Sequence, residues 1–306
     1  MADLNVDLAG IPLANPTILA SGILGTTSGS LKQAASGGAG AVTIKTITIE
    51  PRSGHHNPTL IEVEHGLLNA VGYSNMGLDA ALEEFANLKD IGVPVIASVV
   101  GETTDEFVEV AKGLSELDFT ALEIPLSCPH TPGVGLLAGH GTPEATFDIT
   151  AAVRDVWDKS LIVKLSPSVT EIGLIAEKAV EAGADILNVG NSLGPGMSIN
   201  LTAKKPVLDF KFGGYSGPAV RPITIRCIYD VFKATAGAVP IVGCGGITTG
   251  LDAIESFMAG ASAVGIGSGV YYRGVEVFGL VCDEIEEFME AGGYSSVKDL
   301  LGVAHG

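Results

Sequence analysis

Reactive side chains directly follow short apolar stretches, a position where core packing gives no reason to place them. Cys128 follows the apolar stretch 120–124, and Lys45 and Lys164 end two others. A thiol there can act as a base or as a nucleophile if its pKa is suitable. Buried lysines are rare unless paired, and snorkelling to solvent is the alternative. We therefore expect Cys128 to be a catalytic base or nucleophile and both lysines to face an anionic substrate or cofactor.

Two glycine clusters follow the last two apolar stretches, at residues 243–247 (GCGGI) and 265–269 (GIGSG). Loops after the seventh and eighth strands of a barrel often bind phosphate through backbone N–H groups. Neither cluster matches a Walker loop or a dinucleotide-binding fingerprint. The pair predicts a cofactor that carries phosphate, with plain turns as the alternative.

The remaining histidines and cysteines point to no metal centre. His55, His56 and His65 have a spacing that matches no familiar metal site, so we expect no bound metal. Cys227 and Cys282 lie in helical patterns, where a cysteine is usually a small buried apolar residue.

Eight short apolar strands are expected, near 16–20, 41–45, 94–99, 120–124, 160–165, 185–190, 239–243 and 262–266. Most are continuous apolar runs, which indicate strands buried on both faces of a parallel sheet. Glycine-rich joints, each leading from the end of a helix into a strand, recur at 37–44, 182–189 and 259–266. Apolar residues have helical spacing at 107–114 and 172–180. Alternating strands and helices predict an α/β fold, a (β/α)8 TIM barrel.

Three segments fall outside this repeat. Residues 46–80 and 191–220 are rich in Gly, Pro and polar residues, and we expect both to be loops inserted at the C-terminal face, where barrels build active sites. Residues 4–13 predict an N-terminal β-hairpin on the opposite face. Since no linker interrupts the pattern, residues 1–306 are expected to form a single domain.

Composition excludes several classes of function. With 17 basic and 35 acidic residues the net charge is −18, so we expect no nucleic-acid partner. No apolar run reaches the roughly 18 residues that span a bilayer, and the N-terminus is acidic where a signal peptide would be basic. Four cysteines without paired spacing fit a reducing compartment. We expect a cytoplasmic protein without a membrane partner.

Motifs along the whole chain resemble those of the dihydroorotate dehydrogenase family, specifically its class 1, which is soluble and uses a cysteine base. The stretches that carry the resemblance are 20–22 (ASG), 45–48 (KTIT), 50–52 (EPR), 57–59 (NPT), 68–72 (LNAVG), Asn75, Gly77, 127–129 (SCP), 163–167 (VKLSP), 191–192 (NS), 216–219 (SGPA) and the two glycine clusters.

The resemblance implies an FMN-binding barrel that oxidises dihydroorotate to orotate in pyrimidine biosynthesis. Cys128 would remove a C5 proton while hydride passes from C6 to flavin N5, and Lys45 would touch both flavin and substrate. The implied cofactor-binding residues are Ser21, Lys45, Thr46, Ser98, Lys164, Gly190, Gly217, Gly245, Gly246, Gly267 and Ser268. The implied substrate-binding residues are Lys45, Asn69, Ala70, Val71, Gly72, Tyr73, His130, Asn191 and Ser192.

Two positions depart from the family pattern. Pro125 stands where the family normally has an asparagine that contacts flavin and substrate, and His130 stands where a second asparagine is usual. Proline has neither an amide side chain nor a backbone N–H, so it cannot replace that contact. Two other functions therefore stay open: an FMN oxidoreductase acting on a different dihydropyrimidine or cyclic substrate, and a non-catalytic barrel that binds flavin or phosphate.

The partners implied by the resemblance are a second copy of the chain and, in some family members, a separate flavin and iron–sulfur subunit for electron transfer. The electron acceptor stays open between fumarate, NAD through a partner subunit, and another oxidant. Because this chain lacks the cysteines for a cluster, any iron–sulfur centre would belong to the partner.

Overall fold

A closed barrel of eight parallel strands forms the centre of the computed structural model, which describes residues 2–126 and 139–306. The barrel strands are β3 (Thr17–Leu19), β4 (Ala41–Thr43), β7 (Val95–Ser98), β8 (Ala121–Pro125), β9 (Ser160–Leu165), β10 (Ile186–Val189), β15 (Ile241–Cys244) and β16 (Ala263–Ile266). Each pairs in parallel with the next in this order, and β16 closes on β3. All eight predicted strands and the predicted TIM barrel are confirmed.

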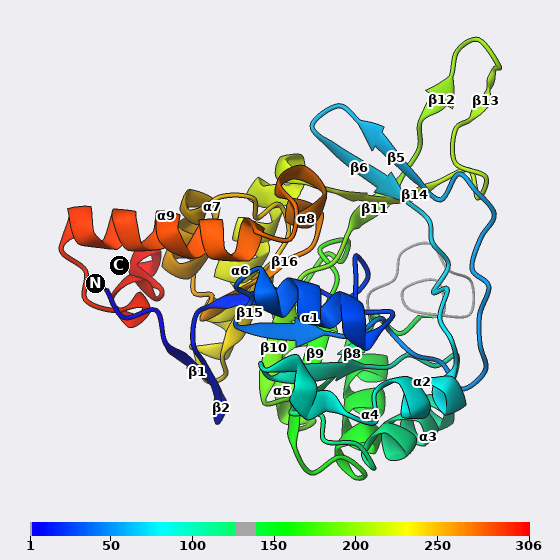
Figure 1. Ribbon diagram of the computed structural model, residues 1–306, viewed down its shortest axis with the longest axis horizontal. Coiled ribbons are helices and arrows are strands. Elements are labelled where there is room, and N and C mark those ends of the chain that lie inside the picture. Colours follow the sequence, from blue (N-terminus) through cyan, green and yellow to red (C-terminus); the bar gives the residue numbers. More distant parts are fainter. Residues whose placement is uncertain (1, 127–138) are drawn as a thin grey trace.

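Helices surround this barrel (Figure 1). They are α1 (Ser28–Ser36), α2 (Leu78–Glu84), α3 (Thr104–Leu114), α4 (Pro143–Arg154), α5 (Ile172–Glu181), α6 (Arg221–Thr235), α7 (Gly250–Met258), α8 (Ser268–Arg273) and α9 (Val277–Gly292), with single 3-10 turns η1 (Leu88–Ile91), η3 (Pro218–Val220), η4 (Val297–Leu300) and η5 (Val303–His305). The joints that end α5 and α7 turn through Gly183 (φ 101°) and Gly260 (φ 119°), a backbone conformation that L-residues rarely adopt. The glycine-rich joints therefore have the backbone that the sequence predicts.

The expected N-terminal hairpin is present and lies on the opposite face of the barrel from the long loops. Strands β1 (Val6–Leu8) and β2 (Ile11–Leu13) pair antiparallel around Ala9 and Gly10, which both take positive φ. Two consecutive positive φ values are typical of a tight hairpin turn. The hydroxyl of Ser160, at the amino end of β9, donates to the Ala9 carbonyl at 3.3 Å and ties the hairpin to that face.

The two long inserted segments form a second sheet, which the sequence did not predict. Its strands are β5 (Leu60–Val63), β6 (Gly66–Asn69), β11 (Leu193–Gly196) and β14 (Gly213–Ser216), in the antiparallel order β11-β14-β6-β5. These strands lie together on one side of the barrel, and the hairpin of β12 (Ile199–Asn200) and β13 (Lys205–Pro206) projects beyond them (Figure 1). The segments after the second and sixth barrel strands are thus joined over the barrel's C-terminal face.

The hydrophobic core fills the barrel wall and the space between strands and helices, with Val163, Leu187 and Val264 fully buried. Buried runs on both faces of the sheet explain why these strands lack alternation in sequence. Among the residues that the structure describes, no helix is long and apolar enough to span a membrane.

Candidate active site

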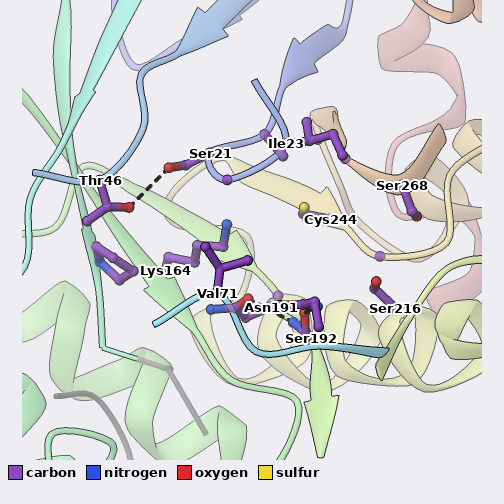
Figure 2. A pocket seen from close by; sticks show the side chains of 18 of the residues that line it. Ser21, Ile23, Thr46, Val71, Lys164, Asn191, Ser192, Ser216, Cys244 and Ser268 are labelled. Carbon is purple, nitrogen blue, oxygen red and sulfur yellow. Dashed lines mark hydrogen bonds between the residues drawn. The ribbon is translucent and has the colours of Figure 1, made fainter. Parts of the chain in front are cut away.

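A cavity opens at the carboxyl ends of the barrel strands, under the second sheet (Figure 2). Barrel enzymes build their active sites on this face. The predicted site residues that line the cavity are Ser21, Lys45, Thr46, Asn69, Val71, Gly72, Tyr73, Lys164, Gly190, Asn191, Ser192, Gly245, Gly246, Gly267 and Ser268. The fold therefore brings together residues that lie between positions 21 and 268 of the sequence.

Three hydroxyl groups form a chain on one wall of the cavity. The Ser21 hydroxyl donates to the Ile44 carbonyl at 2.8 Å and lies 3.1 Å from the Thr46 hydroxyl (Figure 2), which lies 3.0 Å from that of Ser98. Ser98 is fully buried and does not line the cavity, so it reaches the cavity through Thr46. These hydrogen bonds fix the side-chain rotamers of Ser21 and Thr46. Both hydroxyl groups can still form a hydrogen bond with a bound polar group.

Lys164 is buried inside the barrel beside an acidic partner. It is 4% exposed, and its Nζ lies 3.8 Å from Oε1 of Glu123, which is 2% exposed. Burial lowers the pKa of a lysine, but the carboxylate of Glu123 and, when ionised, the Cys244 thiol outweigh that effect and hold the pKa of Lys164 above its usual value. The ammonium is therefore charged at neutral pH and can attract an anion.

Lys45, the second predicted lysine, lies just after β4, which is separated from β9 by β7 and β8 in the barrel. Its Nζ is 5.6 Å from the centre of the Tyr73 ring, within the range of a cation–π contact. Its backbone N–H donates to the Gly25 carbonyl at 2.9 Å, which fixes the chain just after β4. The two lysines enter one cavity from different strands, so both can act on the same ligand.

Asn69 and Ser192 connect the two inserted segments inside the cavity. The Asn69 amide donates to the Ser192 hydroxyl at 3.3 Å and to the Gly214 carbonyl at 3.1 Å. The backbone N–H of Ser192 donates to Oδ1 of Asn191 at 2.8 Å. These contacts hold three polar side chains at one edge of the cavity, where they can recognise a planar polar ligand.

The glycine loops after β15 and β16 form another part of the cavity wall. Gly246 takes φ 78°, and a Cβ at Gly245 would come 2.2 Å from Oγ1 of Thr224 on α6. Only glycine therefore allows this loop to turn so closely against α6. Gly267 is the N-cap of α8 and Ser268 its first residue, so residues from both glycine loops line the cavity.

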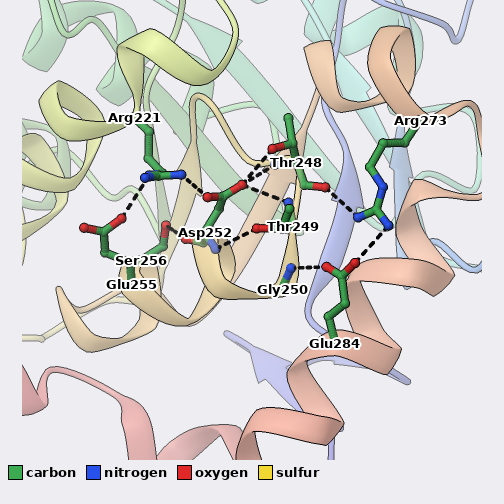
Figure 3. A network of polar contacts seen from close by, with 9 residues as sticks. All are labelled: Arg221, Thr248, Thr249, Gly250, Asp252, Glu255, Ser256, Arg273 and Glu284. Carbon is green, nitrogen blue, oxygen red and sulfur yellow. Dashed lines mark hydrogen bonds and ion pairs between the residues drawn. The ribbon is translucent and has the colours of Figure 1, made fainter.

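A polar network behind these loops holds them together (Figure 3). Arg273, at the end of α8, donates to the Thr248 carbonyl and to Glu284, each at 2.8 Å, and Glu284 accepts from the Gly250 N–H at 2.5 Å. Asp252 accepts from the backbone of Thr248 at 2.9 Å. The loop after β15 and the helix after β16 are thus braced by the same residues.

Arg221 forms the other side of this network. Its guanidinium pairs with Asp252, and its Nε lies 3.0 Å from Glu255. A Cβ at Gly246 would come 2.7 Å from Cβ of Arg221, so the arginine backbone packs directly behind the glycine loop. Its charge is directed to the two carboxylates (Figure 3), which leaves anion binding at this edge to backbone groups.

Three predicted site residues within the described part of the chain do not line the cavity. Ala70 and Gly217, like Ser98, are placed behind the cavity wall. The Ala70 carbonyl lies 3.0 Å from Nδ1 of His55, whose ring stacks on Phe210 at 3.9 Å. Cys128 and His130 lie outside the described residues, as do the other positions from 127 to 138.

Pro125 lies in the cavity wall at the end of β8, paired in register with Lys164. The next residue, Leu126, donates its N–H to the Lys164 carbonyl at 3.2 Å. Proline at this position therefore interrupts neither strand pairing nor the barrel. It removes a hydrogen-bonding side chain from the cavity at the position where the family pattern has an asparagine.

Sequence reasoning missed two polar residues inside the barrel, Glu123 and Asn188. Each stands in the middle of an apolar strand (Ala-Leu-Glu-Ile and Ile-Leu-Asn-Val), and that interruption was the available signal. Cys244 was noticed only as part of a glycine cluster, although it lines the cavity. The other described cysteines, Cys227 and Cys282, lie on α6 and α9, where burial raises the pKa of each thiol to about 11.

A closed barrel of parallel strands, with two lysines and paired glycine loops around one cavity at its C-terminal face, places the chain among the TIM-barrel proteins. The family model for dihydroorotate dehydrogenase matches residues 3–289. The catalytic subunit of dihydroorotate dehydrogenase B (NAD(+)) from Methanothermobacter thermautotrophicus is 44% identical over 303 residues, covering 99% of this chain and 98% of the relative. That from Pyrococcus abyssi is 45% identical over 304 residues, covering 98% and 99%.

A solved structure shows the same architecture. The dihydroorotate dehydrogenase of Eimeria tenella, crystallised with ferulenol, aligns with a TM-score of 0.86 and 26% identity, covering 99% of this chain and 89% of that one. The chain therefore belongs to the dihydroorotate dehydrogenase family, in its class 1. The resemblance seen in the sequence is confirmed.

Proposed function

We propose that the chain oxidises dihydroorotate to orotate in pyrimidine biosynthesis, as a single FMN-binding domain with Cys128 as general base. The observation that carries this proposal is the family match over residues 3–289 together with one cavity that gathers Lys45, Asn69, Lys164 and Asn191. A non-catalytic barrel would have no reason to keep these groups facing one space.

The residues that line the cavity suit FMN. The loops at Gly245–Gly246 and Gly267–Ser268 present backbone N–H groups suited to the phosphate. The charged Lys164 suits the negative charge that a flavin ring gains on reduction, and Thr46 and Ser21 offer hydroxyl groups beside it. Ser98 supports Thr46 from behind, while Gly190 and Gly217 shape the surrounding backbone.

Asn69 and Asn191–Ser192 suit the polar edge of a pyrimidine ring, and Val71, Gly72 and Tyr73 complete that side of the cavity. Lys45 would neutralise the substrate carboxylate. We assign His130 a substrate contact next to the base, and Ala70 a backbone role beside Asn69.

Bound FMN would accept the hydride from C6 of dihydroorotate. Cys128 would take the C5 proton onto its sulfur, so the thiolate is its active form. Lys45 and Lys164 place positive charge where the substrate carboxylate and the electron-rich product state need it. The sheet of β5, β6, β11 and β14 covers this side of the cavity and would exclude water from the reacting atoms.

Electron transfer beyond this chain requires a partner. The relatives from Methanothermobacter thermautotrophicus and Pyrococcus abyssi are named as catalytic subunits of an enzyme that uses NAD(+). We propose that a second copy of this chain and a separate subunit with flavin and an iron–sulfur cluster complete the enzyme, with NAD(+) as final acceptor. The chain's four cysteines lack the spacing of a cluster site.

Anaerobic titration of the purified protein tests this function. We expect a yellow protein that releases FMN on denaturation, loses its flavin absorbance when dihydroorotate is added, and changes its spectrum when orotate binds. Cys128→Ala should keep the flavin and lose at least about 1000-fold in the rate of flavin reduction, the scale of a general base. An oxidised spectrum unchanged by millimolar orotate contradicts the proposal.

Pro125 favours a second candidate function, the oxidation of another dihydropyrimidine or cyclic substrate. Pro125 lines the cavity yet offers no polar group to a substrate amide. Flavin reduction by a panel of dihydropyrimidines would separate the two functions, because the true substrate reduces the flavin fastest.

A further inference from the structure

Four polar side chains form a cluster inside the barrel, three of them in the cavity wall and one, Asn188, behind it. Glu123 comes from β8, Lys164 from β9, Asn188 from β10 and Cys244 from β15, and these four strands are neighbours in the barrel. Glu123 is 2% exposed and Asn188 is 5% exposed. No predicted role uses Glu123 or Asn188, although both are costly to bury.

The contacts of Glu123 orient it toward Lys164. Its Oε2 accepts from the Asn188 amide at 2.6 Å, which fixes the carboxylate, and its Oε1 lies 3.8 Å from Nζ of Lys164. Among the described residues, neither Oε1 nor Oδ1 of Asn188 has a hydrogen-bond partner. The pair is therefore held by charge at a distance longer than a direct hydrogen bond, and the ammonium keeps its donors for the cavity that Lys164 lines (Figure 2).

Stability does not explain this arrangement. A buried ion pair seldom stabilises a fold more than apolar side chains of the same volume, because desolvation offsets the attraction. The surrounding strands are otherwise packed with apolar residues such as Val163, Leu187 and Ile124. We therefore look for the role of Glu123 in the charge of Lys164, which lines the cavity.

We propose that Glu123 is a positioning residue that acts through Lys164: it keeps the lysine ammonium charged and directed into the cavity, and so sets the reduction potential of the bound flavin. The proposal rests on the proposed function, since it requires FMN in this cavity. Asn188 holds the Glu123 carboxylate in place through its hydrogen bond and so supports the same positioning role.

The sign of the effect follows from the charges. Removing the carboxylate while Lys164 stays protonated leaves an excess positive charge, which favours the electron-rich flavin and raises its potential. Removing the carboxylate also leaves burial to lower the pKa of Lys164, since burial raises the pKa of the Cys244 thiol and leaves that group neutral. The other titratable groups that line the cavity in the described part of the chain are Lys45 and Tyr73, and both stay in place.

The test is the midpoint potential of the bound flavin from pH 6 to pH 10, by equilibration with redox dyes. In Glu123→Gln we expect a potential above wild type at pH 6, and the difference should shrink and reverse as Lys164 loses its proton. Glu123→Asp keeps the charge and should stay close to wild type. A merely structural role predicts the opposite ranking, because Gln keeps the shape of Glu and Asp does not.

Thr150→Val is the matched control for packing. Thr150 is fully buried on α4 and its hydroxyl has no partner among the described residues, so the change alters the core and should leave the potential unchanged. If Glu123→Gln does not fold, the double variant Glu123→Gln with Lys164→Gln removes both charges and leaves none unpaired. Its potential should lie below wild type at every pH.

A potential equal to wild type at every pH, in Glu123→Gln or in the double variant, overturns the inference. Wild-type protein that binds no FMN, or whose flavin dihydroorotate does not reduce, contradicts the proposed function instead. The variants therefore test the role of Glu123, and the wild-type protein tests the proposed function.

Discussion

The side-chain amide of Asn69 donates to the hydroxyl of Ser192 across two segments that are 123 residues apart in sequence. Asn69 belongs to the insertion after the second barrel strand, and Ser192 to the insertion after the sixth. Their contact, with the Gly214 carbonyl as a second acceptor, makes one polar edge from two distant pieces of chain.

Replacing Asn69 should therefore weaken substrate binding while the flavin stays bound. Asn69→Ala removes both hydrogen bonds and the amide offered to the substrate, so we expect the KM for dihydroorotate to rise about tenfold or more, equivalent to ~1.4 kcal/mol. Steady-state kinetics and the flavin content measure the two effects. Asn5→Ala, which changes an exposed residue near the N-terminus, is the control. If the KM of Asn69→Ala equals that of wild type, Asn69 does not bind the substrate.

Arg273 should control flavin affinity from outside the cavity. Arg273→Lys loses the planar fork that joins the Thr248 carbonyl to Glu284, so the glycine loops lose a brace. We expect the dissociation constant of FMN to rise roughly three- to tenfold, measured by fluorescence of released flavin. Arg226→Lys, in a surface ion pair on α6, should bind FMN as wild type does, and equal affinity in both variants would contradict the prediction.

Pro125 separates the two candidate functions. If the natural substrate is another dihydropyrimidine, Pro125→Asn restores the missing amide and should raise kcat/KM for dihydroorotate at least about tenfold. Equal or lower turnover favours dihydroorotate as the natural substrate. Pro125→Ala is the control, because it removes the ring without supplying an amide, and an equal gain in Pro125→Ala would trace the effect to the backbone.

His140 should make stability depend on pH. Burial lowers the pKa of His140 below its ordinary value of 6.5, and its Nε2 lies 3.2 Å from the Glu102 carbonyl. The unfolded chain then binds a proton that the folded chain does not. His140 therefore contributes stability above about pH 6.5, which is lost as the pH falls toward the lower folded pKa.

Thermal unfolding at pH 7.5 and pH 5 measures this effect. We expect the Tm of wild type to fall more between pH 7.5 and pH 5 than the Tm of His140→Gln. The glutamine keeps a donor for the Glu102 carbonyl but has no titrating ring. His56→Gln changes an exposed histidine and should behave as wild type. Parallel acid losses in wild type and His140→Gln would refute the assignment.

The barrel could be predicted because each of its strands is marked by residues close together in the sequence. Runs such as Leu161–Val163 and Ala263–Ile266 are apolar throughout, and Gly260, just before the second run, marks where the preceding helix ends. The cavity residues followed from the same pattern, since strand ends meet on one face of a barrel. Position alone thus identified Lys45 and Lys164.

The second sheet could not be predicted in this way. Strands β11 (LGPG) and β14 (GGYS) are rich in glycine and short, and their pairing depends on partners far away in sequence. Glu123 was missed for a related reason: one polar residue in an apolar strand does not reveal which neighbour will balance its charge. Contacts between strands decide both features.

The pairing of β14 with β6 also has a consequence for synthesis. Asn69 emerges from the ribosome long before Gly214, its partner 145 residues later. Until then β6 is paired with β5 along one edge and open along the other, an edge on which other chains can add. A growing chain that already contains β5 and β6 therefore presents an open strand edge until β14 has been made.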